Sequence, residues 1–330
     1  MRIEEIISTA IKYKASDVHL HQGMLPLFRI NNALGPVPEY QEALKHDNIA
    51  SYIYNVCELD DKKVLGNRDS VDIAKNIGNT RCRINIFINA NGPAIAIRIL
   101  NNSIAPMMKL RIPLSVQRLI QESHGLIIFS GPTGSGKTTS IASFLDEVNR
   151  MYQKHIISIE DPIEIIHTPI KSLISQREVG FHCKGYLQGL KSALREDPDI
   201  IFIGELRDPE TVQTALTAAE TGHLVLTTLH SATVIEAVER LTQFFPRAAY
   251  NQVVNQVANC MKGIIAQRLL LRADNEGRVA AYEVLLNTTA TRNLIRQGNI
   301  HKLTEYMIRD GMQTMEESIQ GLKDMGIVAP

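Results

Sequence analysis

The sequence predicts a two-domain α/β protein in which a compact α+β domain precedes a larger domain built around a parallel sheet. The chain has 330 residues, more than one hydrophobic core usually contains, which favours two domains. Residues 1–100 combine helical segments with an antiparallel strand pattern, whereas from Leu114 onward short apolar runs alternate with helical segments. The second pattern is typical of parallel strands joined by helical crossovers.

The smaller domain is expected to span residues 1–100. An apolar stripe predicts its first helix, and the stripe consists of Ile3, Ile6, Ile7, Ala10 and Ile11. Residues 17–20 alternate polar and apolar side chains as a strand does, and residues 41–57 predict a second helix. Three further strands are expected at residues 71–74, 81–89 and 94–100. Because short turns separate these three strands, they are predicted to form an antiparallel meander.

A linker is expected at residues 101–113, which contain Asn and Pro residues and show little apolar periodicity. The larger domain is then expected over residues 114–330, with a helical C-terminal part at residues 291–330. Its buried strands are predicted at four apolar runs, at residues 126–129, 156–159, 200–203 and 224–226.

The composition argues against nucleic-acid-binding, membrane-spanning and secreted proteins. Lysine plus arginine equals aspartate plus glutamate at 35 each, so no net basic field attracts nucleic acid or anionic lipid. No apolar run approaches the ~20 residues of a membrane span, and residues 1–5 lack the apolar core of a secretory signal. The four cysteines are far apart and include no C-x-x-C pair, which favours reduced thiols in a cytosolic protein.

The segment GPTGSGKT matches the phosphate-binding loop pattern G-x-x-x-x-G-K-[ST] at every position. The predicted phosphate-binding residues are Gly131, Pro132, Thr133, Gly134, Ser135, Gly136, Lys137, Thr138 and Thr139. The glycines allow backbone N–H groups to turn toward one anion without Cβ clashes. Lys137 supplies positive charge for the β- and γ-phosphates, and the Thr138 hydroxyl can bind Mg²⁺.

The neighbouring sequence strengthens the motif. Residues 126–129 predict a buried strand directly before the loop, and residues 139–150 predict a helix directly after it. The amino terminus of that helix would direct its partial positive charge at the phosphates. A strand, a loop and a helix in this order indicate a nucleotide site rather than an ordinary glycine-rich turn.

Two other predicted strands end in carboxylates that suit phosphate chemistry. Residues 197–205 end in Glu205, which could orient or deprotonate an attacking water or could be an ordinary surface residue. The Asp that usually precedes such a Glu and binds Mg²⁺ is replaced by Gly204. Glu160 or Asp161 could supply the missing metal contact or position water, or could begin a turn, because Asp-Pro is a common turn starter.

Histidines flank the predicted strand at residues 224–226, with His223 before it and His230 after it. A histidine at a strand end can contact the γ-phosphate or orient a neighbouring carboxylate, or it can be a polar strand end without such a role.

Five arginines are further candidates. Arg83 and Arg98 are expected on adjacent strands of the meander, where ordinary exposed side chains are the alternative. The larger domain adds Arg195, Arg207 and Arg240, which could contact phosphate as planar donors or form surface ion pairs.

Taken together, these segments resemble the type II/type IV secretion and pilus ATPases, and within them the PilT-like pilus-retraction branch. The resemblance covers nearly the whole chain and is carried by six segments, residues 15–20, 81–85, 131–138, 159–164, 194–208 and 219–230. The last three segments resemble the Asp box, the atypical Walker B segment and the His box of that family. In this family pattern the glycine at position 204 is expected.

The resemblance implies a PAS-like N-terminal domain, a RecA-like ATPase domain and a homo-hexameric ring that hydrolyses ATP with Mg²⁺. It implies that Glu205 is the catalytic glutamate. It also implies that Glu160 is the Asp-box acid, which would contact the metal directly or through water.

Other residues match the family by position. Arg83 and Arg98 match an arginine pair that reaches the nucleotide as the ring closes. By the same resemblance, His223 and His230 are the His-box residues, and Arg240 matches a phosphate-proximal arginine.

The resemblance favours a motor for pilus retraction, and hence for twitching-type motility. Assembly ATPases carry extra N-terminal sequence and usually a four-cysteine metal module, and the sequence shows neither. Residues 292–296 and 311–315 resemble the retraction branch, whereas Thr227 and Thr291 depart from it. Such a cytoplasmic motor would act on an inner-membrane pilus platform protein, alongside related pilus ATPases.

Three other functions are alternatives to pilus retraction. An assembly or secretion ATPase of the same superfamily would have the same chemistry. A nucleic-acid motor is disfavoured by the zero net charge, the absence of Trp and an aromatic content of 5%, because these give no stacking signal. A nucleotide sensor that does not hydrolyse is disfavoured by the intact Lys137, Thr138 and Glu205.

Overall fold

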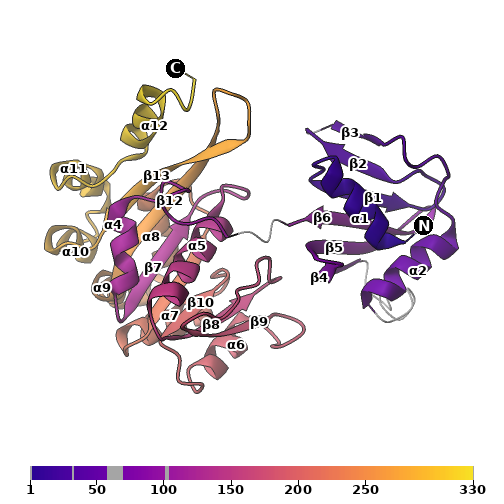
Figure 1. Cartoon of the computed structure of the whole chain (residues 1–330). Coiled ribbons are helices and arrows are strands. Elements are labelled where there is room, and N and C mark those ends of the chain that lie inside the picture. Colours follow the sequence, from indigo (N-terminus) through magenta and orange to yellow (C-terminus); the bar gives the residue numbers. More distant parts are fainter. Residues whose placement is uncertain (1, 32, 58–69, 101–103, 330) are drawn as a thin grey trace. The chain divides into compact units, whose positions relative to one another are not determined.

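The computed structural model describes residues 2–31, 33–57, 70–100 and 104–329. The chain divides into two compact units (Figure 1). The smaller unit comprises residues 1–103 with residues 162–166, and the larger unit comprises residues 104–161 with residues 167–330.

In the described residues, the smaller unit forms a six-stranded antiparallel sheet in the order β3-β2-β1-β6-β5-β4. Its strands are β1 (Asp17–His21), β2 (Leu27–Ile30), β3 (Ala33–Pro36), β4 (Ser70–Ile77), β5 (Thr80–Asn89) and β6 (Gly92–Ile99). Two helices, α1 (Ile3–Lys12) and α2 (His46–Cys57), bury their apolar sides against one face of this sheet. The predicted α+β arrangement is therefore present in this unit.

The strand period of two determines which face is buried. In β1, Val18 and Leu20 are buried, whereas Asp17 and its alternate neighbours lie on the opposite, partly exposed face. In α1, the predicted stripe is buried except for Ile11, whose side chain is 49% exposed. At 100° per residue Ile11 lies about 80° around the helix from Ile3, at the edge of the stripe. The prediction that Ile11 belongs to the buried stripe is therefore wrong.

The larger unit is built on a mostly parallel seven-stranded sheet in the order β13-β12-β7-β11-β10-β8-β9. Its strands are β7 (Gly125–Ser130), β8 (His155–Glu160), β9 (Leu173–Glu178), β10 (Ile200–Ile203), β11 (Leu224–Leu229), β12 (Met261–Leu271) and β13 (Arg278–Leu286). Only the β12–β13 pair is antiparallel among the strand pairs of this sheet in the described residues. The carboxyl ends of the central strands consequently meet at one edge of the sheet.

Helices cover both faces of this sheet (Figure 1). The helices and 3₁₀ turns are α4 (Leu114–Gln117), η1 (Arg118–Gln121), α5 (Lys137–Met151), α6 (Tyr186–Ala193), α7 (Pro209–Glu220), α8 (Val234–Gln243), η2 (Arg247–Ala249), α9 (Tyr250–Cys260), α10 (Thr289–Arg296), η3 (Ile300–Lys302), α11 (Leu303–Arg309) and α12 (Met315–Asp324). On one face α5 packs with α4 and η1, and on the other face α6 to α11 pack together. The last helix, α12, packs against β13 near the end of the β12–β13 hairpin.

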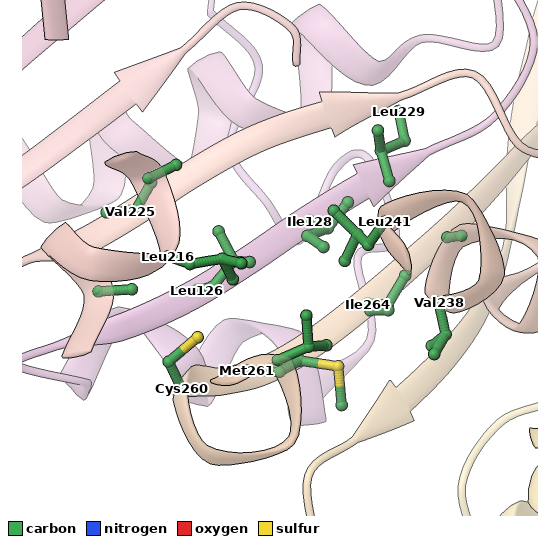
Figure 2. Close-up of a cluster of buried hydrophobic side chains, with 14 of the residues drawn as sticks. Leu126, Ile128, Leu216, Val225, Leu229, Val238, Leu241, Cys260, Met261 and Ile264 are labelled. Atoms are coloured by element: carbon green, nitrogen blue, oxygen red, sulfur yellow. The ribbon is translucent and has the colours of Figure 1, made fainter. Parts of the chain in front are cut away.

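Figure 2 shows the core on the second face. Leu126 and Ile128 of β7 contact the same apolar cluster as Val225 and Leu229 of β11. Residues from three helices and from β12 complete the labelled cluster, namely Leu216, Val238, Leu241, Cys260, Met261 and Ile264. Burying each large aliphatic side chain contributes about 1.5–3 kcal/mol, so this core holds β7 and β11 firmly side by side.

The predicted linker at residues 101–113 is wrong for residues 104–113, which pack within the larger unit. Met107 and Ile112 are buried in the core beneath α5, and the Ala105 carbonyl accepts a hydrogen bond from Ser143 Oγ at 2.6 Å. Residues 101–103 lie outside the described residues. The sequence also gave no indication that residues 162–166 would cluster with the smaller unit, where the Ile163 carbonyl accepts a 2.8 Å hydrogen bond from the Arg81 guanidinium.

Candidate active site

The phosphate loop connects β7 to α5 at the carboxyl edge of the parallel sheet. The Gly131 N–H donates to the Leu229 carbonyl at 3.2 Å, which ties the start of the loop to the end of β11. Ile203 of β10 pairs with Thr227 of β11 and with Ile159 of β8, so these strands are in register. The residues that follow β11, β10 and β8 therefore emerge at the same edge as the loop.

Two loop glycines occupy positions where a side chain would not fit. Gly131 has a φ of 146° and Gly136 has a φ of 91°. A Cβ atom would lie 2.5 Å from the Gln267 carbonyl oxygen at Gly131 and 2.7 Å from Gln267 Nε2 at Gly136. Gly134 also has a positive φ, of 76°, but a Cβ there would meet open space. The loop thus needs glycine at its two ends for reasons of packing as well as conformation.

Hydrogen-bond donors gather inside this loop. The Lys137 side chain is buried, and its Nζ donates to the carbonyls of Gly131 at 2.7 Å and Pro132 at 3.0 Å. Ser135 Oγ is buried and has no hydrogen-bond partner among the described residues. The half-buried Thr138 and the exposed Thr139 follow in the first turn of α5. A cationic ammonium, a free hydroxyl and a helix amino terminus together suit an anion.

Glu205 follows β10 and lies within a cluster of charged side chains. Its Oε1 forms an ion pair with Nη2 of Arg207, and its Oε2 lies 3.7 Å from Nε2 of His230. Arg207 Nη1 also lies 3.8 Å from Oδ2 of Asp161, and the guanidinium lies 5.9 Å from the centre of the Tyr186 ring. Because His230 directly follows Leu229, this cluster adjoins the start of the phosphate loop.

A cavity of about 320 Å³ lies at this cluster, and Glu205, Arg207, His230 and Arg240 are among its lining residues. Arg240 Nη1 donates to the His230 carbonyl at 3.3 Å, so Arg240 lies beside this cluster, and its expected role near a phosphate stays a prediction. Burial, and next the positive charge of Lys137, lower the pKa of the His230 imidazole, and the Glu205 carboxylate opposes this shift. His230 is therefore neutral at neutral pH.

Glu160 is the last residue of β8 and its side chain is buried at the same edge. Its Oε1 accepts hydrogen bonds from Ser158 Oγ at 2.6 Å and from Gln176 Nε2 at 3.2 Å. Gln176 belongs to β9, and its Oε1 accepts the His167 N–H at 2.8 Å. These contacts fix the orientation of the Glu160 carboxylate, which a contact to metal-bound water requires.

The structure supplies a physical reason for glycine at position 204. A Cβ atom there would lie 3.2 Å from the Tyr186 hydroxyl and 3.3 Å from the Ile159 carbonyl oxygen, which is tighter than ordinary contact. The Gly204 carbonyl also accepts a 2.6 Å hydrogen bond from Thr228 Oγ1. An aspartate in this place would require Tyr186 or the Ile159 carbonyl to shift by a few tenths of an ångström.

A second cavity, of about 260 Å³, lies beside the other end of the phosphate loop and was not predicted. Gly136, Thr139 and Ser140 line one side of it. Its other lining residues are mostly apolar or cationic, with the Gln267 amide and the Tyr282 hydroxyl as neutral polar groups; they are Lys109, Leu110, Arg111, Gln267, Leu269, Arg272, Arg278, Val279, Ala280 and Tyr282. The sequence does show the cationic residues Lys109 and Arg111 in the predicted linker. However, no sequence pattern near them indicates that they lie beside the β12–β13 hairpin.

His223 does not meet this site within the chain. It precedes β11, and its carbonyl accepts the Gly125 N–H at the start of β7, whereas the phosphate loop follows the end of β7. The six residues of β11 separate His223 from His230, which at about 3.3 Å per residue is roughly 20 Å. Within one chain, His223 therefore lies too far from the phosphate loop to bind the same nucleotide, contrary to the expectation. Arg195 also precedes its strand, β10, and so lies toward the same far edge.

Arg83 and Arg98 lie in the smaller unit, where they are direct partners across β5 and β6. Two like charges so placed repel each other, and nearby carboxylates offset the repulsion. Arg98 Nε lies 3.0 Å from Asp17 Oδ1, and Arg83 Nε lies 3.7 Å from Asp72 Oδ1. Their expected role at a nucleotide remains a prediction.

Comparison with known proteins identifies the family. The model of the type II/IV secretion system protein family matches residues 1–328 of the chain. The chain belongs to this family. A type IV pilus retractation ATPase, PilT, of Pseudomonas aeruginosa is 35% identical over 333 residues, which cover 100% of this chain and 96% of that protein. An uncharacterized protein, YggR, of Escherichia coli K12 is 37% identical over 325 residues, which cover 97% and 98% of the two chains.

A solved structure supports the same assignment. The crystal structure of the pilus retraction motor PilT with bound ADP superposes with a TM-score of 0.92 at 40% identity, covering 100% of this chain and 95% of that one. The resemblance to the PilT-like members of the secretion-ATPase family is thereby confirmed, as is the predicted fold of an N-terminal domain followed by a RecA-like domain. None of the helices in the described ranges is long and apolar enough to cross a membrane.

The donor set of this family member fits a nucleoside triphosphate with Mg²⁺. The glycine-lined turn leaves no room for side chains at its ends, and Ser135 Oγ is free to donate to a phosphate oxygen. The Thr138 hydroxyl follows Lys137 as an oxygen ligand of the kind Mg²⁺ prefers. The oriented carboxylate of Glu160 lies at the same sheet edge and suits contact with metal-bound water.

Proposed function

We propose that this protein is an ATPase whose hydrolysis of ATP drives the retraction of a type IV pilus. The observation that carries the proposal is the convergence, at one edge of one sheet, of a glycine-lined anion loop and the Glu205 carboxylate. His230 connects the two parts, because it lies 3.7 Å from Glu205 and directly follows Leu229, which binds the loop. The full-length likeness to pilus retraction ATPases supports the direction of movement.

Each residue of the site has a distinct part in this proposal. The loop N–H groups and Lys137 would bind the phosphates, and Thr138 would hold Mg²⁺, which would neutralise charge on the phosphates. Glu205 orients the attacking water and accepts its proton. In the structure Glu205 is paired with Arg207, so that pair has to loosen before the carboxylate can act as a base. Neutral His230 can accept or donate a hydrogen bond at the same place.

The second cavity suits the base and ribose of the nucleotide. Gly136 and Thr139 belong both to the phosphate loop and to this cavity, so a bound nucleotide could extend from one into the other. Leu269, Val279 and Tyr282 offer an apolar surface for a base. The cationic side chains around the rim favour a negatively charged ligand.

Our proposal for assembly and location is supported by the family likeness. The protein would act as a homo-hexamer in the cytoplasm, associated with the inner membrane through a pilus platform protein and accompanied by related pilus ATPases. Arg83 and Arg98 would complete the nucleotide site as the ring closes. Charge reversal at either arginine should then depress turnover without unfolding the protein, and unchanged turnover would make both residues structural.

A gene deletion in the source organism tests the direction of movement. Loss of a retraction motor should cause surface fibres to accumulate, and wild-type protein should restore their normal number, whereas Glu205→Gln should not. Loss of fibres would instead identify an assembly ATPase. An unchanged fibre number would remove this protein from pilus movement.

A further inference from the structure

One buried amide lies between the phosphate loop and the helix that follows it. Gln267 belongs to β12, which runs parallel to β7, and its side chain is 2% exposed. Gln267 Nε2 donates to the Ser135 carbonyl at 2.8 Å, and Gln267 Oε1 accepts from Ser140 Oγ at 2.8 Å. The two ends of one amide thus hold the residues on either side of Lys137.

The first of these bonds determines the direction of a peptide group in the loop. The Ser135–Gly136 peptide is planar, and in a trans peptide the C=O and N–H groups point in opposite directions. Because the Ser135 carbonyl is directed at Gln267, the Gly136 N–H is directed away from β12. A reversed peptide would instead present a carbonyl oxygen to an incoming phosphate, which repels an anion.

The close approach of Gln267 is also what excludes side chains from the loop. The nearest atom to a Cβ at Gly131 is the Gln267 carbonyl oxygen, and the nearest atom to a Cβ at Gly136 is Gln267 Nε2. The first and last glycines of the loop therefore pack against the same residue of the neighbouring strand.

The second bond continues toward the 260 Å³ cavity. Ser140 Oγ lies 3.5 Å from the Tyr282 hydroxyl, which donates to the Leu110 carbonyl at 3.1 Å. Burial raises the pKa of Tyr282 to about 12, so this hydroxyl keeps its proton at neutral pH. Gln267, Tyr282 and Leu110 all line the cavity, so a polar path joins its wall to the phosphate loop.

We infer that Gln267 is a positioning residue that sets the phosphate-binding orientation of the loop through its bond to the Ser135 carbonyl. The inference rests on the proposed nucleotide-binding function of the loop and adds a residue that lies about 130 positions away in the sequence. Gln267 acts through the loop, and the effect of its loss should appear in nucleotide affinity.

The test compares three variants of the full chain in steady-state ATP hydrolysis, with ADP affinity measured separately by calorimetry. Gln267→Met keeps the side-chain length and removes both hydrogen bonds. Gln267→Glu keeps an acceptor for Ser140 but replaces the donor to Ser135 with a carboxylate. Ser140→Ala removes the bond from the helix to Gln267 and the contact with Tyr282, but it keeps the bond between Gln267 and Ser135. Gln267→Met and Gln267→Glu should raise the KM for ATP and the Kd for ADP roughly 10- to 100-fold, with kcat changed less than about threefold.

Ser140→Ala should raise both constants less than about threefold, because the bond to Ser135 is retained. The matched control is Glu283→Gln. Glu283 is a buried residue of β13 that pairs with Ala266 of β12, so its side chain lies on the opposite face of the hairpin from Gln267. It should leave KM and Kd unchanged. Thermal unfolding checks that each variant is folded, and if Gln267→Met fails to fold, Gln267→Glu carries the comparison.

Wild-type affinity in the folded Gln267 variants would overturn the inference. So would a fall in stability with unchanged KM and Kd, because a merely structural residue would behave in that way. An equal loss of affinity in Ser140→Ala would also overturn it, since the helix contact would then be responsible. If the wild-type chain itself binds no nucleotide, the proposed function fails, and that result is distinct from any difference between variants.

Discussion

Gly136→Ala should destabilise the larger unit more than Gly134→Ala, although both glycines have positive φ. An L-residue in the left-handed region costs about 1–2 kcal/mol, and both variants incur that cost. Only at Gly136 would the new Cβ lie 2.7 Å from Gln267 Nε2, whereas at Gly134 it would meet open space. The Gln267 amide would have to move and leave the Ser135 carbonyl without its partner, which costs about 1–3 kcal/mol for a buried group.

The difference in unfolding free energy between the two variants is therefore expected to be about 1–3 kcal/mol. At about 2–4 °C per kcal/mol for a domain of this size, the melting temperatures should differ by roughly 2–12 °C. Thermal unfolding should be followed without nucleotide, because bound ligand would add its own stabilisation. Gly222→Ala, another open position with a φ of 113°, measures the conformational cost outside the loop. Equal melting temperatures for Gly136→Ala and Gly134→Ala would refute the packing argument.

Two further predictions concern stability and pH. Thr227→Val should raise the unfolding free energy by about 1–2 kcal/mol, because Thr227 Oγ1 is buried without a hydrogen-bond partner in the described part of the chain. A lower melting temperature of the variant would show that the Thr227 hydroxyl does form a hydrogen bond. Because the pKa of His230 is lowered on folding, the folded state binds a proton at this imidazole less readily than the unfolded state does. The unfolding free energy therefore keeps the full contribution of neutral His230 above the usual pKa of about 6.5, and loses it as the pH falls toward the folded-state pKa. In the same acid range, protonated His230 should pair with Glu205 and reduce kcat. A pH–rate profile should therefore show a fall of kcat at acid pH in the wild type but not in His230→Gln. An identical fall in both proteins would exclude His230 as its source.

The sequence predicted correctly those elements that are determined by residues adjacent in the chain. The strand, loop and helix around Lys137 follow one another directly, so the motif and its apolar neighbours predicted all three, although α5 begins at Lys137 and not at residue 139. The meander of the smaller domain was predicted for the same reason, because its strands are separated only by short turns.

Three strands of the larger sheet, β9, β12 and β13, were missed for identifiable reasons. β9 is an edge strand with the polar residues Ser175, Gln176 and Arg177 at its centre, so it lacks an apolar run. β12 begins at Met261 directly after α9 ends at Cys260, so no turn residue marks the boundary. β13 was missed with its partner β12, since a hairpin is predicted from both of its strands.

Long-range features of the site could not be read from the sequence. His223 and His230 flank the same strand, and only the parallel direction of β11 decides that His230 meets the loop. The Tyr186 hydroxyl leaves little space for a side chain at position 204, but Gly204 and Tyr186 belong to different elements, so the sequence does not show that they are neighbours. Gln267 likewise reaches the loop only because β12 lies next to β7.

In the proposed function, Glu205 acts on the terminal phosphate of a nucleotide held by the loop. The most direct measurement is phosphate release from ATP by the purified wild type and Glu205→Gln, with ATP affinity measured in parallel. We expect the variant to bind ATP with near wild-type affinity and to release phosphate at least about 100-fold more slowly, the lower end of what a general base contributes. Phosphate release by Glu205→Gln at the wild-type rate would contradict the account.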